Sequence, residues 1–169
     1  MSAPLHRLAT LADFEAVYAI YMADEVIPYL GFDPMPRTSF LGVMQGLVAS
    51  RAFHVVEREG RVRGFYRASR GEGRARHVAR LGTLAVAPEE QGSGLARSMI
   101  EAAIATLRAD GVTRIELTVE VDNPRAQRFY GKLGFELEGT MRHAYQRSDD
   151  SGYVDQLLMA RLLFTASPG

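Results

Sequence analysis

The segment from Val78 to Val121 constrains the fold of this chain more than any other. It contains an apolar run at 78–87, the glycine-paired loop QGSGLA at 91–96 and the alternating run RIELTVEV at 114–121. Between the loop and the second run, apolar side chains recur at helical spacing before Gly111, at Ala96, Met99, Ala103 and Leu107. We therefore expect a strand, a helix and a second strand, joined by a right-handed crossover that makes the strands parallel.

The flanking segments predict the other strands and helices. Helices are expected after Thr10, which forms a capping box with Asp13, and from about Thr38, where apolar side chains recur on one side. A further helix is expected from the cap residue Asn123, followed by proline, to Gly134, and Gly134 and Gly111 are expected as C-terminal caps. Further strands are expected at 5–9, 52–57, 62–69, 135–147 and 152–164. The last two strands flank the turn SDDSG at 148–152 and predict a long antiparallel hairpin. The expected fold class is α/β, with helices packed on a mixed (α+β) sheet.

Length and composition bound the domain count and the location. With 169 residues and 47% hydrophobic content, the chain suits one globular domain over 1–169. Twenty basic residues balance twenty acidic ones, so no overall field favours nucleic acid or an acidic membrane. The sequence has no signal-peptide pattern, no apolar run of transmembrane length and no cysteine, which predicts a cytoplasmic protein. The four histidines have no metal-ligand spacing, so we expect no metal.

The loop QGSGLA at 91–96 indicates an anion site, and a second interpretation stays open. A helix that begins near Ser93 presents unpaired backbone N–H groups and the positive end of its dipole, and two glycines let a phosphate approach that backbone. The same glycines would equally serve a tight strand-to-helix turn. The loop lacks the Lys-Ser/Thr of nucleotide hydrolases and the GxGxxG of dinucleotide-binding proteins, so neither class is favoured.

Two motifs, one in this loop and one in the helix after Asn123, resemble those of the GNAT superfamily of N-acetyltransferases. The pattern Q/R-x-x-G-x-G/A is met by Gln91, Gly94 and Ala96. The pattern N-x-x-A-x-x-x-Y-x-x-x-G-F is met by Asn123, Ala126, Tyr130, Gly134 and Phe135. The likeness extends from RLAT at 7–10 to YVDQLLMARLL at 153–163. It is greatest to the branch of ribosomal-protein N-terminal acetylases and small amine or amino-acid acetylases.

The resemblance implies a fold and a co-substrate. The implied fold is a central, mostly antiparallel sheet of about seven strands with one parallel, splayed pair, flanked by about four helices. The implied co-substrate is acetyl-coenzyme A, with its pyrophosphate on the loop backbone and its pantetheine arm along the strand edge near Leu84–Val86. A backbone N–H of that edge would meet the oxyanion. The implied contacts are Leu84, Ala85, Val86, Gln91, Gly92, Ser93, Gly94, Leu95, Ala96, Asn123, Ala126 and Tyr130.

Direct acetyl transfer to an amine needs a proton donor for the departing thiolate and a base for the amine. The family places the hydroxyl of Tyr130 beside the sulfur, and a phenol of pKa about 10 can protonate a thiolate whose conjugate acid is near 8.5. Many relatives carry a glutamate five residues before the asparagine, where this chain has Thr118. We select Glu120, on the same strand face, as the candidate base, although it equally fits an exposed strand charge. His143, Asp155 and a water chain are further candidates.

A weak base predicts an acceptor with a weakly basic amine. At pH 7, deprotonating a lysine-type amine of pKa about 10.4 costs roughly 4 to 5 kcal/mol, whereas an α-amino group near 8 costs little more than about 1 kcal/mol. We therefore expect transfer to the α-amino group of an amino acid, an analogue or a peptide N-terminus. Such folds build the acceptor pocket from the first two helices and the last hairpin. The residues selected there are Glu25, Tyr29, Phe32, Tyr145 and Asp155, of which the first three would equally fit packing.

Three other functions remain open on sequence grounds. A polyamine or antibiotic acetylase would use the same machinery on another amine. A non-catalytic acyl-coenzyme A sensor would share the fold but would be expected to lack the hydroxyl of Tyr130. An RNA-associated protein would use the arginine-rich stretch at 67–80, which lacks the interleaved aromatics of such surfaces. The expected partners are a small-molecule amine or a peptide N-terminus, with no nucleic acid and no membrane, and a homodimer stays open.

Overall fold

The computed structural model describes residues 3–148 and 152–164. The chain forms two compact units. Unit 1 holds the residues up to Ala68 together with Gly82–Ala102, and unit 2 holds Ser69–Leu81 together with the residues from Ala103 onward. The expectation of one domain over 1–169 stays a prediction.

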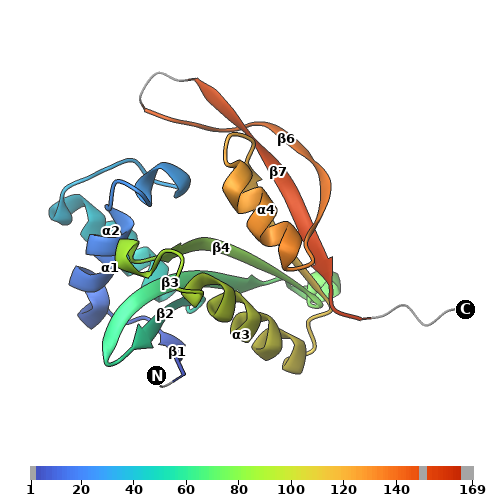
Figure 1. The fold of residues 1–169 in the computed structure, drawn as a ribbon, viewed down its shortest axis with the longest axis horizontal. Coiled ribbons are helices and arrows are strands. Elements are labelled where there is room, and N and C mark those ends of the chain that lie inside the picture. Colours follow the sequence, from blue (N-terminus) through green and yellow to red (C-terminus); the bar gives the residue numbers. More distant parts are fainter. Residues whose placement is uncertain (1–2, 149–151, 165–169) are drawn as a thin grey trace, which may run out of the picture. The chain divides into compact units, whose positions relative to one another are not determined.

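The described residues form seven strands and four α-helices, labelled in Figure 1. The strands are β1 (Leu5–Leu8), β2 (Phe53–Arg58), β3 (Arg61–Arg70), β4 (Val78–Val86), β5 (Arg114–Glu120), β6 (Glu136–Gln146) and β7 (Tyr153–Leu162). The helices are α1 (Phe14–Tyr21), α2 (Arg37–Ala49), α3 (Leu95–Ala109) and α4 (Pro124–Lys132). Short 3-10 turns lie at η1 (Leu11–Asp13), η2 (Ile27–Tyr29), η3 (Gly73–Ala75) and η4 (Pro88–Glu90).

The strands form one sheet in the order β1-β2-β3-β4-β5-β7-β6. β4 and β5 are the parallel pair, with Val78–Arg80 opposite Arg114–Glu116. The pairs β1–β2, β2–β3, β5–β7 and β6–β7 are antiparallel. The expected mixed, mostly antiparallel sheet of seven strands with one parallel pair and four helices is therefore confirmed. The splay of the parallel pair stays a prediction.

In unit 1, α1 and α2 pack aromatic side chains against β2 and β3. The ring of Tyr21 on α1 lies 5.1 Å from that of Phe40 on α2 and 5.7 Å from that of Phe65 on β3, centroid to centroid. Phe53 on β2 lies 5.3 Å from Phe65. All four side chains are fully buried, and large buried rings contribute most to a core of this kind. The apolar helix faces predicted from periodicity supply this core.

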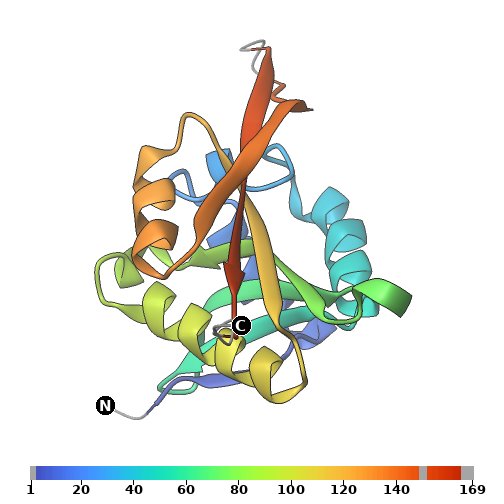
Figure 2. The same ribbon diagram turned by 90° about the vertical axis from the view of Figure 1, so that its right-hand side faces the viewer.

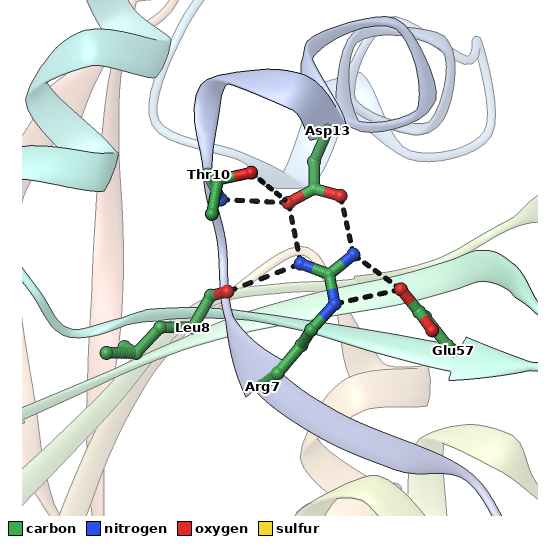
Figure 3. A network of polar contacts seen from close by, with 5 residues as sticks. All are labelled: Arg7, Leu8, Thr10, Asp13 and Glu57. Atoms are coloured by element: carbon green, nitrogen blue, oxygen red, sulfur yellow. Dashed lines mark hydrogen bonds and ion pairs between the residues drawn. The ribbon is translucent and has the colours of Figure 1, made fainter.

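Arg7 joins β1 to the start of α1 through a network of ion pairs (Figure 3). Its Nη1 and Nη2 donate to the two carboxylate oxygens of Asp13 at 2.8 and 2.7 Å, and its Nε donates to Glu57 on β2 at 2.8 Å. The backbone N–H of Thr10 also donates to Asp13, at 2.8 Å, which closes the capping box predicted from the sequence. The hydrogen bonds from Arg7 are the main cause that lowers the pKa of Asp13.

In unit 2, β6 and β7 form the predicted long hairpin, which extends beyond the neighbouring α4 in both views (Figures 1 and 2). Its register shifts between Met141 and Tyr145. There His143 has a φ of 50°, and its backbone N–H donates to the carboxylate of Asp155 at 2.7 Å. Arg161 on β7 donates from Nη1 to the carbonyl oxygen of Leu133 at 2.9 Å, which fixes the end of α4 to the hairpin. The predicted turn at 148–152 lies largely outside the described residues.

The glycines at the turns and helix ends adopt the conformations expected of them. Gly111 and Gly134, which follow α3 and α4, have φ values of 86° and 83°, as the predicted C-terminal caps require. α3 begins at Leu95 and not near Ser93 as expected, because the positive φ values of Gly92 and Gly94 cannot belong to an α-helix. Within the described residues, no helix combines the length and the apolar character needed to cross a membrane.

Candidate functional site

The loop Gln91–Ala96 leads into α3 within unit 1. Gly92 and Gly94 have φ values of 78° and 85°, in the left-handed region that glycine adopts readily. A Cβ added to either glycine would meet no heavy atom within 4 Å, so the space beside this backbone is open. Ser93 is exposed and Leu95 is fully buried, so the side chain of Leu95 fixes the start of α3. The N–H groups of the first turn of a helix have no acceptor within the helix. This arrangement fits an anion such as a phosphate.

Glu90 fixes the loop to β2 and β3. Its carboxylate accepts hydrogen bonds from Nη1 of Arg58 at 2.7 Å and from Oγ of Ser93 at 2.9 Å, and Nε of Arg63 lies 3.8 Å away. Ser93 Oγ in turn accepts from the backbone N–H of Leu95 at 3.2 Å. The loop therefore has a defined shape before any ligand binds, which lowers the entropy that binding must remove.

The end of β4, Leu84–Val86, is the predicted edge for the pantetheine arm. Thr83, directly before it, has a φ of 47°, which costs a β-branched residue free energy. A Cβ added to Gly64 on β3 would lie 2.9 Å from the carbonyl oxygen of Ala85 and 3.2 Å from Sδ of Met99, so only glycine fits there. Strained and closely packed backbone of this kind is frequent at functional sites.

In unit 2, Asn123 begins α4 as predicted. Its Oδ1 accepts from the backbone N–H of Ala126 at 3.1 Å, and Pro124 occupies the first helical position. Gln127 donates from Nε2 to the carbonyl oxygens of Glu120 and Val121, both at 3.1 Å. These bonds fix the connection between β5 and α4.

Tyr130 lies on α4, two turns after Asn123, and is half-buried. Its ring makes edge contacts with Phe129 and Phe135, with centroids at 5.2 and 5.8 Å. Burial raises the pKa of the Tyr130 hydroxyl, and the negative charge of Glu120 raises it further. The packing interpretation and the proton-donor interpretation are compatible, because the ring is packed while the hydroxyl stays protonated at neutral pH.

Glu120, the last residue of β5, is buried with 8% of its surface exposed, which overturns the alternative of an exposed strand charge. Burial raises the pKa of its carboxyl, and side-chain hydrogen bonds from Gln156 and Asn123 oppose that shift. Gln156 is its direct partner across β5 and β7. A buried carboxyl with a raised pKa is typical of a general acid or base.

Tyr145, Arg147 and Asp122 lie around Glu120. Arg147 donates from Nη1 and Nη2 to the two carboxylate oxygens of Asp122 at 2.5 and 3.2 Å, and from Nη2 to the hydroxyl of Tyr145 at 3.1 Å. Burial raises the pKa of Tyr145 to about 12, and the charge of Glu120 contributes in the same direction. The hydrogen bond to Arg147 lowers the pKa of Asp122. Together with Tyr130, the cluster thus holds one buried carboxyl, one exposed carboxylate, one cation and two phenols within unit 2.

The other predicted acceptor residues have different surroundings. The Asp155 carboxylate receives the N–H of His143, so it supports the backbone of the hairpin. In unit 1, Tyr29 is the last residue of η2 and Phe32 follows it; they are 47% and 46% exposed, and Glu25 is exposed as well. Unit 2 therefore brings Tyr145 together with Glu120 and Tyr130, and unit 1 carries Glu25, Tyr29 and Phe32.

Sequence reasoning did not identify Arg147 and Gln156, nor Glu90, which holds the loop Gln91–Ala96 to β2 and β3. The alternation of GYVDQLLMA, paired with that of RIELTVEV, could have placed Gln156 opposite Glu120. No sequence signal pointed to the Arg147–Asp122 pair, which depends on the register of the hairpin. Among the described residues, no group of three or more metal-ligating side chains comes together.

Comparison with known proteins agrees with these motifs. The model of the acetyltransferase (GNAT) family matches residues 13–135. An uncharacterised N-acetyltransferase of Mycobacterium tuberculosis (strain ATCC 25618 / H37Rv) is 33% identical over 104 residues, which cover 62% of this chain and 65% of that protein. The L-amino acid N-acetyltransferase AaaT of Escherichia coli (strain K12) is 49% identical over 70 residues, covering 41% of this chain and 40% of that protein. The chain thus spans less than two thirds of the length of these relatives.

Among solved structures, yncA of Salmonella typhimurium, determined with its cofactor acetyl-CoA, has a TM-score of 0.73 and 21% identity, covering 99% of this chain and 98% of that one. At that identity, the likeness shows a shared fold. With the family match, it confirms the resemblance inferred from the two motifs.

Proposed function

Because the chain belongs to the acetyltransferase (GNAT) family, we propose that it transfers an acetyl group from acetyl-coenzyme A directly to a primary amine, preferably an α-amino group. One observation carries this proposal. Unit 2 holds a buried carboxyl, Glu120, and a half-buried phenol, Tyr130, and the surroundings raise the pKa of both. Such a pair suits proton removal at one end of a transfer and proton donation at the other.

The loop Gln91–Ala96 is proposed to bind the pyrophosphate of the co-substrate. The open space beside Gly92 and Gly94 and the position of these glycines directly before the N-terminus of α3 support this role. Asn123 and Ala126 are proposed as further contacts at the start of α4. Leu84–Val86 are proposed to pair with the pantetheine arm through strand backbone. The acetyl-CoA bound to yncA supports the choice of co-substrate.

Glu120 is proposed to take the proton of the acceptor ammonium, which frees a nitrogen lone pair. The nitrogen then forms a bond to the acetyl carbonyl carbon while the carbon–sulfur bond breaks. Tyr130 gives its proton to the departing thiolate. The nitrogen, now positively charged, loses its second proton to water, and water returns a proton to Tyr130, so that the amide and the thiol are both neutral. No covalent intermediate with the protein is needed, which agrees with a chain that has no cysteine.

The α-amino preference follows from the strength of the base. Burial makes Glu120 a better base than an ordinary carboxylate, yet a lysine-type amine remains roughly 3 to 4 kcal/mol harder to deprotonate at pH 7 than the α-amine of a peptide N-terminus or of an amino-acid amide. The Escherichia coli relative, named for L-amino acids, supports the same class of acceptor.

The test is release of free thiol from acetyl-coenzyme A with a panel of L-amino acids, dipeptides, polyamines and aminoglycosides, with products identified by mass spectrometry. A matched pair, L-alaninamide and N-acetyl-lysinamide, separates α- from ε-amines. We expect turnover with α-amines and little with the ε-amine at pH 7. A clear ε-amine preference would refute the acceptor class. Tight binding of acetyl-coenzyme A without turnover on any amine would identify a sensor instead.

A further inference from the structure

Arg147 is the least satisfied charged side chain of the Glu120 cluster. Its Nη1 and Nη2 atoms are bonded to Asp122 and Tyr145, but its Nε is buried and has no hydrogen-bond partner among the described residues. A guanidinium has five N–H donors in a fixed planar fork. A buried donor left without an acceptor is unfavourable, so this atom needs an explanation beyond folding.

The position of Arg147 relates it to the proposed base. Asp122, which holds the guanidinium, follows Glu120 by two residues, so their Cα atoms lie at most about 7 Å apart. The charges of Arg147 and Glu120 both act on the hydroxyl of Tyr145, and the charge of Arg147 acts on Glu120 itself. The cation and the buried carboxyl therefore lie in one polar cluster within unit 2.

This pair of opposite charges is complementary to a free amino acid. In such an acceptor, one carbon atom separates the ammonium group from the carboxylate. The planar fork of arginine matches a carboxylate bidentately, whereas lysine presents a single point charge. If the ammonium of such an acceptor faces Glu120, its carboxylate lies within a few ångström of that ammonium. A fork of donors such as a guanidinium is suited to bind it there.

Asp122 shows that the fork of Arg147 can bind a carboxylate, because two of its nitrogen atoms donate to this side chain. The side chain of Asp122 is 51% exposed, so it can turn into solvent when another carboxylate arrives. Ion pairs with so exposed a partner contribute little stability. Nε is buried, so an incoming carboxylate reaches it only if Arg147 or the groups that cover it shift; it would then supply the acceptor that this atom lacks.

We propose that Arg147 binds the α-carboxylate of a free amino-acid acceptor, with the side chain of Asp122 occupying the fork when no acceptor is bound. The inference rests on the proposed acetyl transfer to an α-amine and narrows it. It selects free amino acids over peptide N-termini, which carry an amide in place of that carboxylate.

The test compares the best L-amino acid from a panel of the standard twenty with its own carboxamide, using the full chain and thiol release. For each acceptor, kcat/KM of Arg147→Gln is divided by that of the wild type, which removes the difference in amine basicity. We expect a loss of at least about 10-fold with the amino acid, mainly through KM, and less than about 3-fold with the carboxamide. Arg147→Lys, which keeps the charge and removes the fork, should show a smaller but equally selective loss.

Two further variants separate recognition from a structural role. Asp122→Asn removes the competing carboxylate and should lower KM for the amino acid, whereas a purely structural pair predicts the same loss as Arg147→Gln. Arg142→Gln, at an exposed arginine on β6, the strand that ends just before Arg147, should leave the rates with both acceptors unaffected. Melting curves show whether each variant is folded, and Arg147→Lys carries the test if Arg147→Gln is not.

The outcomes are distinguishable. Equal losses with the amino acid and its carboxamide in folded Arg147 variants would overturn this inference and leave acetyl transfer to α-amines intact. If the wild type acetylates no α-amine at all, the proposed function fails and this inference fails with it.

Discussion

Asp13 in unit 1 and Glu120 in unit 2 are almost equally buried, with 7% and 8% of their surfaces exposed, yet their pKa values shift in opposite directions. Asp13 receives two hydrogen bonds from Arg7 and one from the backbone of Thr10, and these outweigh burial. The hydrogen bonds to Glu120 come from a backbone group and from two uncharged side chains, so burial prevails. Burial alone therefore does not distinguish a structural carboxylate from a chemical one. The charge and number of its donors do.

The substitution Tyr130→Phe should have the largest effect, a fall in kcat. Removing the hydroxyl keeps the ring contacts with Phe129 and Phe135 but removes the proton donor, so kcat should fall by about 10²- to 10⁴-fold with KM for acetyl-coenzyme A nearly unchanged. Tyr66→Phe removes a hydroxyl from unit 1 and should leave kcat unchanged. Thiol release at saturating co-substrate measures both. More than half of the wild-type rate in Tyr130→Phe, when chemistry limits turnover, would remove its acid role.

The next largest effects are expected when the carboxylates of Glu120 and Asp13 are each replaced by an amide. Glu120→Gln should lower kcat by at least about 10²-fold without lowering the free energy of unfolding, because it removes a base and also a charge that burial disfavours. Asp13→Asn should lower the free energy of unfolding by about 1 to 3 kcal/mol and leave kcat unchanged.

The variants Glu120→Gln and Asp13→Asn should also differ in how pH changes the rate and the stability. The base must be ionised, so the rate should rise with pH through the raised pKa of Glu120, and Glu120→Gln should lose that limb. The lowered pKa of Asp13 stabilises the fold above the ordinary carboxyl range, and this stability is lost as pH falls toward the folded-state pKa. Urea titrations and rate profiles across pH check both. A stability loss in Glu120→Gln as large as that in Asp13→Asn would contradict the comparison.

A smaller effect concerns two glycines of unit 1. Gly94→Asp places a side chain and a negative charge beside the helix start, so coenzyme A should bind more than about 10-fold more weakly. Gly60→Asp introduces the same strain, because Gly60 has a φ of 72° and equally open surroundings in the β2–β3 turn. It should leave the affinity intact. Calorimetry on both folded variants decides, and unchanged affinity in Gly94→Asp would remove the loop from the site.

The smallest effect is a loss of stability in mild acid. Burial lowers the pKa of His6 and of His54, which stacks on Tyr66 at 5.0 Å. Their neutral forms favour the fold, so stability is retained above the unfolded value near 6.5 and falls as pH drops below it, by about 1 kcal/mol or less. Glu120 acts in the opposite sense, so the Glu120→Gln background isolates the histidines. A melting temperature that does not fall between pH 7.5 and 5.5 in that background would show that neither histidine is coupled to folding.

Local signals in the sequence predicted local structure well. The Asn123–Pro124 cap, the glycines after α3 and α4 and the alternation of β5 each reflect short-range geometry. The one parallel pair in a mostly antiparallel sheet also followed from the crossover unit and the family resemblance.

Contacts that depend on strand register were not predicted. The burial of Glu120 could not be predicted from the alternation of β5, which places Glu120 on the polar face, opposite to Val119. Whether that face is exposed at Glu120 depends on what packs over the end of β5. The Arg7–Glu57 and Arg147–Asp122 pairs join residues 50 and 25 positions apart, and arginine is common enough in this sequence that composition singles out neither.

The irregularity between Met141 and Tyr145 limits how this hairpin can change length during evolution. Opposite the two-residue step from Gln156 to Val154, β6 advances by four residues, so it carries two extra residues that Asp155 holds through the N–H of His143. Loss of one residue here would turn Tyr145 to the opposite face of the sheet, whereas loss of two would restore a regular ladder and keep its face. Homologous chains should therefore differ in the length of this stretch by two residues and not by one. An alignment would show this as insertions or deletions of even length.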